Sequence, residues 1–351
     1  MKLLYLTNTR LPGEKAHAIQ IMHTCSALAA HVKLLLVHGR RVNRRWLRTV
    51  SDLEEYYALP RDVPRREIHS VDLLALIPRL GLQRMWAFRV AFFVQMLTYH
   101  FALCLFILSN RADVYYTRDS LTAALMLLPG LRRGARVFFE AHAFPVSRLG
   151  LILQRWLVSR VDGLTVLTNI LAEQYVTLGA EPERVCVVAD AVALDLFRKR
   201  DKIAARHLLD IDPASFIVMY VGQMYEWKGV ETLIDAASLL PENTQVWLVG
   251  GTVEELPRIE EHVRRSGAVN IKLAGYVRPN KVPWYLSASD VLVLPNSGHA
   301  NVSLYYTSPL KLFEYMAASR PVVASDLPSL REILTHEQNA LLVSPDDPKI
   351  L

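Results

Sequence analysis

Two charged residues in the C-terminal part of the chain have types and spacing that suit nucleotide binding. Lys311 and Glu314 are three residues apart, so both would lie on one face of a helix. Ser308 and Pro309 suit the cap and the first position of a helix that ends near 319–320. A helix N-terminus attracts phosphate, and a carboxylate one turn further in can accept two sugar hydroxyls. The pattern predicts a site for a diphosphate and a ribose. The alternative is a solvated pair of Lys311 and Glu314.

A third charged residue, Lys228, follows a predicted strand about 80 residues earlier in the chain. Residues 216–222 form an apolar run that ends in Gly222, which is typical of a strand covered on both faces. Apolar residues recur at helical spacing over 230–240. A strand, a short loop with a lysine and a helix is how α/β proteins place phosphate at a strand's carboxyl end. Lys228 is therefore a candidate cation for a diphosphate.

The segment that contains Lys228, followed later in the chain by the segment that contains Lys311 and Glu314, resembles the nucleotide-sugar site of the family 4 glycosyltransferases. These are retaining enzymes of the GT-B fold. The resemblance covers nearly the whole chain and implies an α/β protein with two Rossmann-like doubly wound domains facing a cleft. It implies an acceptor-binding domain over 1–194, a charged linker over 195–213 and a nucleotide-sugar-binding domain over 214–351. Residues 338–344 resemble the family's last strand region, so we expect the closing C-terminal helices to be missing.

The resemblance assigns roles to the donor side, with two departures. Glu314 would bind the ribose, but the family's first glutamate falls at Tyr306, and its usual arginine after the first glycine falls at Gln223. The identity of the transferred sugar is therefore open. The expected donor-binding residues are Gly222, Gln223, Lys228, Gly250, Tyr276, Val277, Ser308, Pro309, Leu310, Lys311 and Glu314.

On the N-terminal side, His142 follows an apolar run over 136–140 and so should stand at the carboxyl edge of a strand. The resemblance places it beside the transferred sugar, and the expected catalytic set is His142, Lys228 and Glu314. The expected acceptor side comprises Gly13, Lys15, His17, Arg118 and Asp119, with Glu140 as a weaker candidate. No Gly-x-Gly-x-x-Gly pattern follows the first predicted strand, which argues against a nicotinamide enzyme.

The resemblance implies sugar transfer from a nucleotide diphosphate sugar to a glycan or lipid-linked acceptor, with retention at the anomeric carbon. The leaving diphosphate would take the acceptor proton, and we expect no metal and no other cofactor because cations and a helix dipole stabilise its charge. Two alternatives stay open. A GT-B nucleotide-sugar epimerase would use the same nucleotide contacts, and a non-catalytic partner subunit would fit Tyr306 and Gln223.

The composition indicates a globular protein, and the length exceeds the size at which a single hydrophobic core usually stops growing. The chain has 351 residues, 52% hydrophobic and 21% charged. Three scattered cysteines favour a cytoplasmic location. Residues 1–180 hold 23 Lys and Arg against 12 Asp and Glu, with arginines grouped over 40–48. This charge favours a peripheral contact with the anionic inner face of a membrane; no aromatic platform for nucleic acid accompanies the arginines.

Residues 90–108 form an apolar run long enough to cross a membrane. Gln95, Thr98, Tyr99 and His100 interrupt it. We therefore expect a buried or interface-facing helix, with membrane insertion as the alternative.

Overall fold

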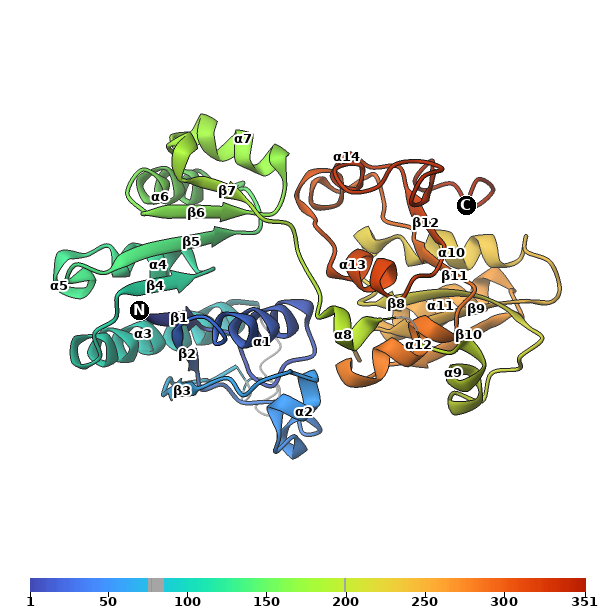
Figure 1. The fold of residues 1–351 in the computed structure, drawn as a ribbon, viewed down its shortest axis with the longest axis horizontal. Helices are drawn as coiled ribbons and strands as arrows, with labels where there is room; N and C mark the ends of the chain where they lie inside the picture. Colours follow the sequence, from blue (N-terminus) through green and yellow to red (C-terminus); the bar gives the residue numbers. More distant parts are fainter. Residues whose placement is uncertain (75–76, 78–84, 199) are drawn as a thin grey trace. The chain divides into compact units, whose positions relative to one another are not determined.

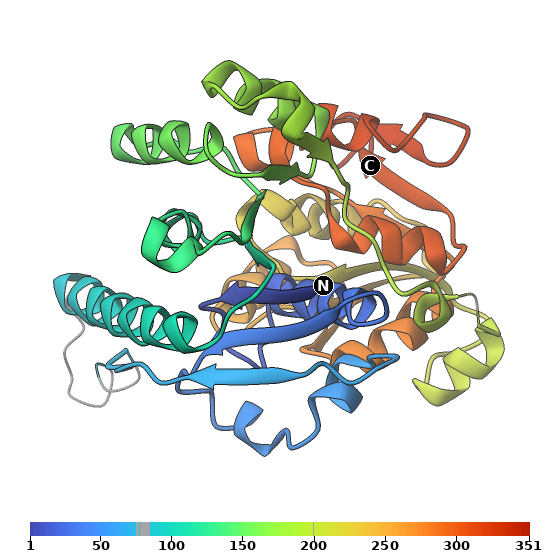
Figure 2. The same ribbon diagram turned by 60° about the vertical axis from the view of Figure 1, so that its left-hand side comes forward.

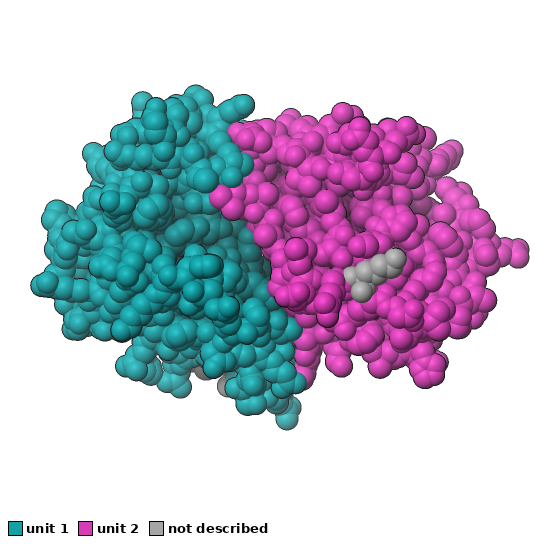
Figure 3. All heavy atoms as spheres, in the orientation of Figure 1, with its two compact units in different colours: residues 1–166, 172–187 teal, residues 167–171, 188–351 magenta. Residues whose placement is uncertain are grey.

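A computed structural model describes residues 1–74, 77, 85–198 and 200–351, and these form two compact units (Figures 1 and 3). The first unit comprises residues 1–166 and 172–187, and the second comprises 167–171 and 188–351. Each unit is built around its own parallel sheet, as the doubly wound expectation requires.

The described part of the first unit contains a sheet of seven parallel strands in the order β3-β2-β1-β4-β5-β6-β7. The strands are β1 (Lys2–Thr7), β2 (Lys33–Gly39), β3 (Arg65–Ile68), β4 (Val114–Thr117), β5 (Arg136–Ala141), β6 (Gly163–Val166) and β7 (Val185–Val187). β5 forms where the apolar run over 136–140 predicts a strand. β3 reads Arg-Arg-Glu-Ile and lies at the sheet edge, where charged side chains are tolerated and apolar alternation is lost.

Helices lie between these strands along the chain. They are α1 (Ala16–Leu28), α2 (Leu53–Tyr57), α3 (Met85–Ser109), α4 (Ser120–Met126), α5 (Pro129–Arg132), α6 (Arg148–Val158) and α7 (Asn169–Leu178), with short 3-10 turns η1 (Leu47–Thr49) and η3 (Pro182–Arg184). Leu3 and Tyr5 of β1 pack into one core with residues of α1 and α2. Alternate residues of a strand point to opposite faces, so Leu4 and Leu6 are buried on the other face.

Helix α3 contains the long apolar run and is held to the first unit along one side. Every fourth residue from Ala87 to Ile107 is buried. Gln95 exchanges hydrogen bonds of 2.8 and 3.0 Å with Asn8, which follows β1, and His100 Nε2 lies 3.1 Å from Thr122 Oγ1. Among the described residues, α3 is the helix whose length and composition would allow it to cross a bilayer, and about a third of its most apolar stretch is buried.

The described part of the second unit contains a sheet of six parallel strands in the order β10-β9-β8-β11-β12-β13. They are β8 (Phe216–Gly222), β9 (Thr244–Gly250), β10 (Ile271–Gly275), β11 (Val291–Leu294), β12 (Val322–Ser325) and β13 (Leu341–Val343). Ile217, Met219 and Val221 pack into a core on one face of this sheet, while Val218 and Tyr220 pack into a second core on the other. The continuous apolar run over 216–222 therefore forms a strand covered on both faces, as predicted.

The helices of the second unit supply both cores. They are α8 (Leu194–Phe197), α9 (Lys202–Leu208), α10 (Val230–Ala237), α11 (Leu256–Ser266), α12 (Val282–Ala288), α13 (Leu310–Ala317) and α14 (Pro328–Arg331), with 3-10 turns η4 (Glu226–Lys228) and η5 (Pro279–Lys281) and a π-helical turn η6 (Val302–Tyr306). Residues of α10 and α11 pack with Tyr220, whereas α12 and α13 pack with Met219.

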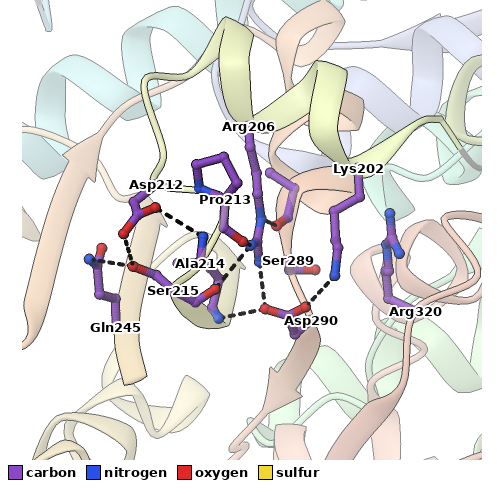
Figure 4. A network of polar contacts seen from close by, with 12 residues as sticks. Lys202, Arg206, Asp212, Pro213, Ala214, Ser215, Gln245, Ser289, Asp290 and Arg320 are labelled. Atoms are coloured by element: carbon purple, nitrogen blue, oxygen red, sulfur yellow. Dashed lines mark hydrogen bonds and ion pairs between the residues drawn. The ribbon is translucent and has the colours of Figure 1, made fainter. Parts of the chain in front are cut away.

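The stretch predicted as a linker, 195–213, instead belongs to the second unit, which begins again at Val188. Phe197, Ala205 and Ile211 are buried in its core, and residue 199 lies outside the described part. Figure 4 shows why the charged stretch is held in place: the fully buried Arg206 donates to three backbone carbonyls and to Asp290 at 2.5 Å. The charged composition of this stretch therefore does not mean solvent exposure, because Arg206 is buried and paired with Asp290.

Candidate functional site

The carboxyl ends of the strands in the second unit bring most of the expected donor-binding residues to one edge of the sheet. β8 ends at Gly222, its neighbour β9 ends at Gly250, and the next strand, β10, ends at Gly275. Ligands of parallel α/β sheets bind outside this edge. Gln223 and Lys228 follow β8, and Tyr276 and Val277 follow β10.

The glycines at this edge are required by close packing of the backbone. A Cβ on Gly250 would lie 2.2 Å from the carbonyl oxygen of Gly222, and the φ of Gly250 is +112°, a conformation that other residues rarely adopt. A Cβ on Gly222 would lie 3.2 Å from Lys311 Nζ. The two predicted glycines therefore let one strand end approach its neighbour and the amine of Lys311.

The two lysines expected to bind a diphosphate are both nearly buried, with exposed fractions of 8% for Lys228 and 7% for Lys311. Lys228 Nζ lies 3.8 Å above the Trp227 ring, and burial lowers its pKa to about 7 against the opposing charge of Asp190. Lys311 Nζ donates to Tyr220 Oη at 2.5 Å. Burial, with the nearby charge of Lys228, holds the pKa of Lys311 well below its usual value. Each amine thus lies in a poorly solvated place that an anion would favour, and the charge of Lys228 acts on Lys311.

Glu314 lies one turn beyond Lys311 on α13 and is half-buried. Burial raises its pKa to about 7; the charge of Lys311 opposes this shift and Asp190 adds to it. Lys311 and Glu314 are therefore part of a buried charged group and not the solvated pair that was the alternative reading. A half-buried carboxyl in this state can accept or donate hydrogen bonds to hydroxyl groups.

The start of α13 differs from the expectation. The helix begins at Leu310 with Pro309 as its N-cap, one residue later than predicted, and no side chain caps it. Ser308 lies one position before the N-cap, and its Oγ accepts a hydrogen bond of 3.0 Å from the backbone N–H of Asp190. This bond ties the 188–193 segment to the helix start, so Ser308 acts as a connection between segments distant in sequence.

Three residues at this edge were not assigned a site role from the sequence. The first is Asp190, whose charge acts on both Lys228 and Glu314. Glu255 accepts hydrogen bonds from the backbone N–H groups of Met224 and Thr252, at 3.0 and 2.9 Å, and so joins the loops after β8 and β9. Its sequence signal is an acidic residue three positions after a threonine, as in a capping box.

The third residue, Asn296, follows β11 and is fully buried. Within the described residues, neither its Oδ1 nor its Nδ2 has a hydrogen-bond partner, and the same holds for Nε2 of Gln223. A buried amide without a partner is costly, so both side chains are suited to a polar ligand or to water. No pattern in the sequence distinguishes Asn296 from an ordinary turn residue. Tyr276 is half-buried, and Val277 packs against the core of this unit.

The first unit carries a separate charged group at the carboxyl edge of its own sheet. His142 follows β5, and its Nε2 lies 2.8 Å from Glu140 Oε1. The same oxygen lies 2.8 Å from Arg118 Nη2, and Tyr116 donates to the other oxygen at 2.8 Å. These partners lower the pKa of Glu140 to about 2 despite its burial, and burial lowers the pKa of His142. Glu140, a weaker candidate in the sequence, is thus the centre of the group.

The remaining residues expected on the acceptor side are Asp119, Gly13, Lys15 and His17, and each has its own structural surroundings. Asp119 caps α4 by accepting from the Thr122 N–H at 2.7 Å, so its carboxylate has a structural partner. The N–H of Gly13 donates to Tyr57 Oη at 2.6 Å, which fixes the loop after β1. Lys15 and His17 are exposed at the start of α1. The structure brings Arg118 and His142 together through Glu140, and the charge of Arg118 also acts on His17.

Comparisons with known proteins agree with this architecture. Residues 14–191 match the family described as "Glycosyl transferase 4-like domain", and residues 215–351 match "Glycosyl transferases group 1". The chain is 29% identical over 220 residues to D-inositol 3-phosphate glycosyltransferase 2 of Catenulispora acidiphila, covering 58% of this chain and 49% of that protein. It is 30% identical over 226 residues to the D-inositol 3-phosphate glycosyltransferase of Mycolicibacterium vanbaalenii, covering 60% and 47%. The chain spans about half the length of these curated relatives.

Solved structures show the same fold at low identity. Anabaena Alr3699/HepE in complex with UDP-glucose superposes with a TM-score of 0.72 at 16% identity, covering 99% of this chain and 87% of that chain. WaaG, described as a glycosyltransferase involved in lipopolysaccharide biosynthesis, superposes with a TM-score of 0.65 at 14% identity, covering 98% and 86%. With family matches over both halves and two parallel-sheet units, the chain belongs to the GT-B glycosyltransferases of the family 4 type.

Proposed function

We propose that the protein transfers a sugar from a nucleoside diphosphate sugar to a hydroxyl of a glycan or lipid-linked acceptor, with retention at the anomeric carbon. The observation that carries the proposal is the group of Lys228, Lys311 and Glu314 at the carboxyl edge of the second sheet. Two similar structures support it, since HepE was crystallised with UDP-glucose and with UDP and glucose. The curated relatives are named as glycosyltransferases.

In the proposed reaction, the bond between the anomeric carbon and the diphosphate oxygen breaks, and a bond to the acceptor oxygen forms on the same face. The acceptor proton passes to the leaving diphosphate, so charge builds up on that diphosphate until the proton arrives. Lys228 and Lys311 would stabilise this charge, because cations act most strongly in a poorly solvated site. A single such contact can contribute about 3 kcal/mol to the transition state. The proposal therefore needs neither a metal nor an organic cofactor.

The charged group at the carboxyl edge of the first sheet would contact a sugar of the substrate. The short distance between Glu140 and His142 Nε2 favours a proton on that nitrogen, which leaves Nδ1 as an acceptor for a sugar hydroxyl. Arg118 keeps Glu140 ionised and so maintains this arrangement. In this proposal His142 contacts the substrate, while Glu140 and Arg118 are positioning residues.

We also propose a cytoplasmic location with peripheral contact to an anionic membrane. The described cysteines are all free thiols, which suits a reducing compartment. The net positive charge of residues 1–180 would attract the anionic lipids of the cytoplasmic leaflet.

The first test is calorimetric titration with UDP, GDP, ADP and NAD, using Lys228→Ala and Glu314→Ala. We expect one nucleoside diphosphate to bind, and both variants to lose that binding. Lys281→Ala is the matched control, because Lys281 is an exposed lysine of the same unit. Absence of binding to all four ligands would contradict the donor site. Binding without turnover on any acceptor would favour a non-catalytic subunit, and conversion of the donor alone would favour an epimerase.

A further inference from the structure

One side of α3 exposes a continuous stripe of large apolar side chains. Its members follow each other at three or four residues and are each 46–68% exposed: Val90, Phe93, Leu97, Phe101, Leu105 and Leu108. Figure 2 shows α3 as the long teal helix beside the strands of the first unit. Contiguous apolar surface of this kind is rare on proteins that contact only water, so the stripe requires a partner.

Contacts on the other side of α3 argue against insertion of the helix across a bilayer. The amide pair between Gln95 and Asn8 and the contact of His100 with Thr122 tie the helix to the first unit, and Tyr99 and Leu103 are fully buried. To cross a bilayer, the helix would have to leave these contacts and expose Gln95 to lipid. An apolar face on a helix that stays docked suits a surface in which it lies flat.

A basic pocket adjoins the C-terminal end of α3. This pocket of about 680 Å³ lies at the amino ends of β1, β4 and β5 and is lined by Lys2, Arg111, Arg133 and Arg136, with Asp113 as the acidic lining residue. Arg133 Nη1 donates to the carbonyl of Leu108 at 2.7 Å, so the pocket and the apolar stripe are joined directly. The pocket therefore carries an excess of positive charge next to the exposed apolar surface.

The arginines that the sequence singled out for membrane contact are less available. Arg44 lies 3.1 Å from Glu14, and Arg41 lies 3.7 Å from Asp72, so acidic side chains offset part of the charge of the 40–48 segment. Arg48 Nε donates to a backbone carbonyl. Among the described residues that line the pocket at the end of α3, Asp113 is the single acidic one, which makes the pocket the better anion site.

We propose that the exposed stripe of α3 and the basic pocket beside it form one docking surface for an anionic lipid bilayer. The stripe lies flat in the headgroup region, and the pocket holds the phosphate of a lipid headgroup. An amphipathic surface with both features binds membranes through apolar burial and electrostatic attraction together. This surface lies wholly within the first unit and does not depend on the donor site of the second.

The first test measures sedimentation with vesicles of phosphatidylcholine, with and without phosphatidylglycerol. We expect binding to the anionic vesicles and its loss in the triple variant Phe93→Gln, Leu97→Gln, Phe101→Gln. These side chains are half-exposed or more, so the variant should fold. The matched control removes three exposed apolar residues of the second unit, Leu239→Gln, Val253→Gln and Val269→Gln, and should bind as the parent does.

The second test removes the charge of the pocket with Arg111→Ser, Arg133→Ser and Arg136→Ser. We expect binding to weaken by roughly fivefold for each arginine, and the remaining binding to depend less on salt. The matched control, Arg40→Ser, Arg45→Ser and Arg48→Ser, should change binding less. A stronger effect of the control would move the docking surface to the 40–48 segment and overturn the proposal.

Two other outcomes would also overturn it. If the parent binds no vesicles but is a dimer that the Phe93 triple variant converts to a monomer, the stripe is an interface between copies of this chain. Protein that stays in the membrane after a carbonate wash at high pH would show that α3 inserts. Nucleotide titration of the same variants separates this proposal from the donor site, because their nucleotide affinity should equal that of the parent.

Discussion

Lys228 has a proposed role in donor binding, and its buried charge lowers the free energy of unfolding. Replacing Lys228 with methionine tests both effects, because the variant should bind no donor and be more stable. Its pKa falls from 10.5 to about 7 because the amine is buried beside Trp227. Each pH unit corresponds to about 1.36 kcal/mol, so the charged amine costs the folded state on the order of 4 kcal/mol at neutral pH. This net cost already includes the opposing charge of Asp190. Methionine fills similar space and contacts an aromatic ring favourably.

We expect Lys228→Met to raise the free energy of unfolding by about 1–4 kcal/mol at neutral pH. The difference from the parent should depend on pH in a defined direction. Between about pH 7 and 10.5 the unfolded parent holds a proton that the folded parent lacks, so raising the pH stabilises the folded parent. The stability advantage of the variant is therefore full below pH 7 and decreases as the pH rises towards 10.5.

Urea denaturation of both proteins, followed by circular dichroism at several pH values, tests this expectation. The control is Lys281→Met, an exposed lysine of the same unit, which should change stability by less than about 0.5 kcal/mol. Nucleotide titration of Lys228→Met should show loss of binding at every pH. A variant that is less stable than the parent, or whose advantage does not change with pH, would refute the assignment of a costly buried amine.

Three further changes test the framework around the two charged groups. Arg206→Met should destabilise the second unit by about 3–5 kcal/mol, because it leaves Asp290 and three backbone carbonyls without this buried partner (Figure 4). Lys202→Met should cost less than about 1 kcal/mol, because the ion pair of Lys202 with Asp290 is more exposed. Urea denaturation compares the stability of the two variants. Gly250→Ala should cost more stability than Gly267→Ala, since both glycines have positive φ but only at Gly250 would the new Cβ meet backbone, and equal costs would mean that φ alone matters. Glu140→Gln should lower the pKa of His142 further, because the carboxylate charge now favours the protonated ring, and an unchanged NMR titration of His142 would contradict this.

The sequence by itself determined the class of the fold and the edge where the chemistry would gather. Apolar runs such as 216–222, separated by segments of helical spacing, are typical of parallel strands covered by helices on both faces. The carboxyl ends of parallel strands lie at the same edge of a sheet. The sequence therefore predicted that Gln223, Lys228 and His142 lie at strand ends, before any contact was known. Local periodicity indicated the strands and helices, and the family resemblance supplied the two-domain arrangement and the roles of the residues at the strand ends.

The tertiary structure decided how each side chain is solvated and which charge it meets. Asp190 acts on Lys228 and Glu314, and its N–H occupies the Ser308 hydroxyl that local pattern had assigned to a helix cap. The burial of Arg206 likewise turned an apparent linker into part of a core. These contacts join residues that are far apart in the chain. Their energies depend on burial and distance, which arise only once the chain has folded, so residue type and spacing could not reveal them.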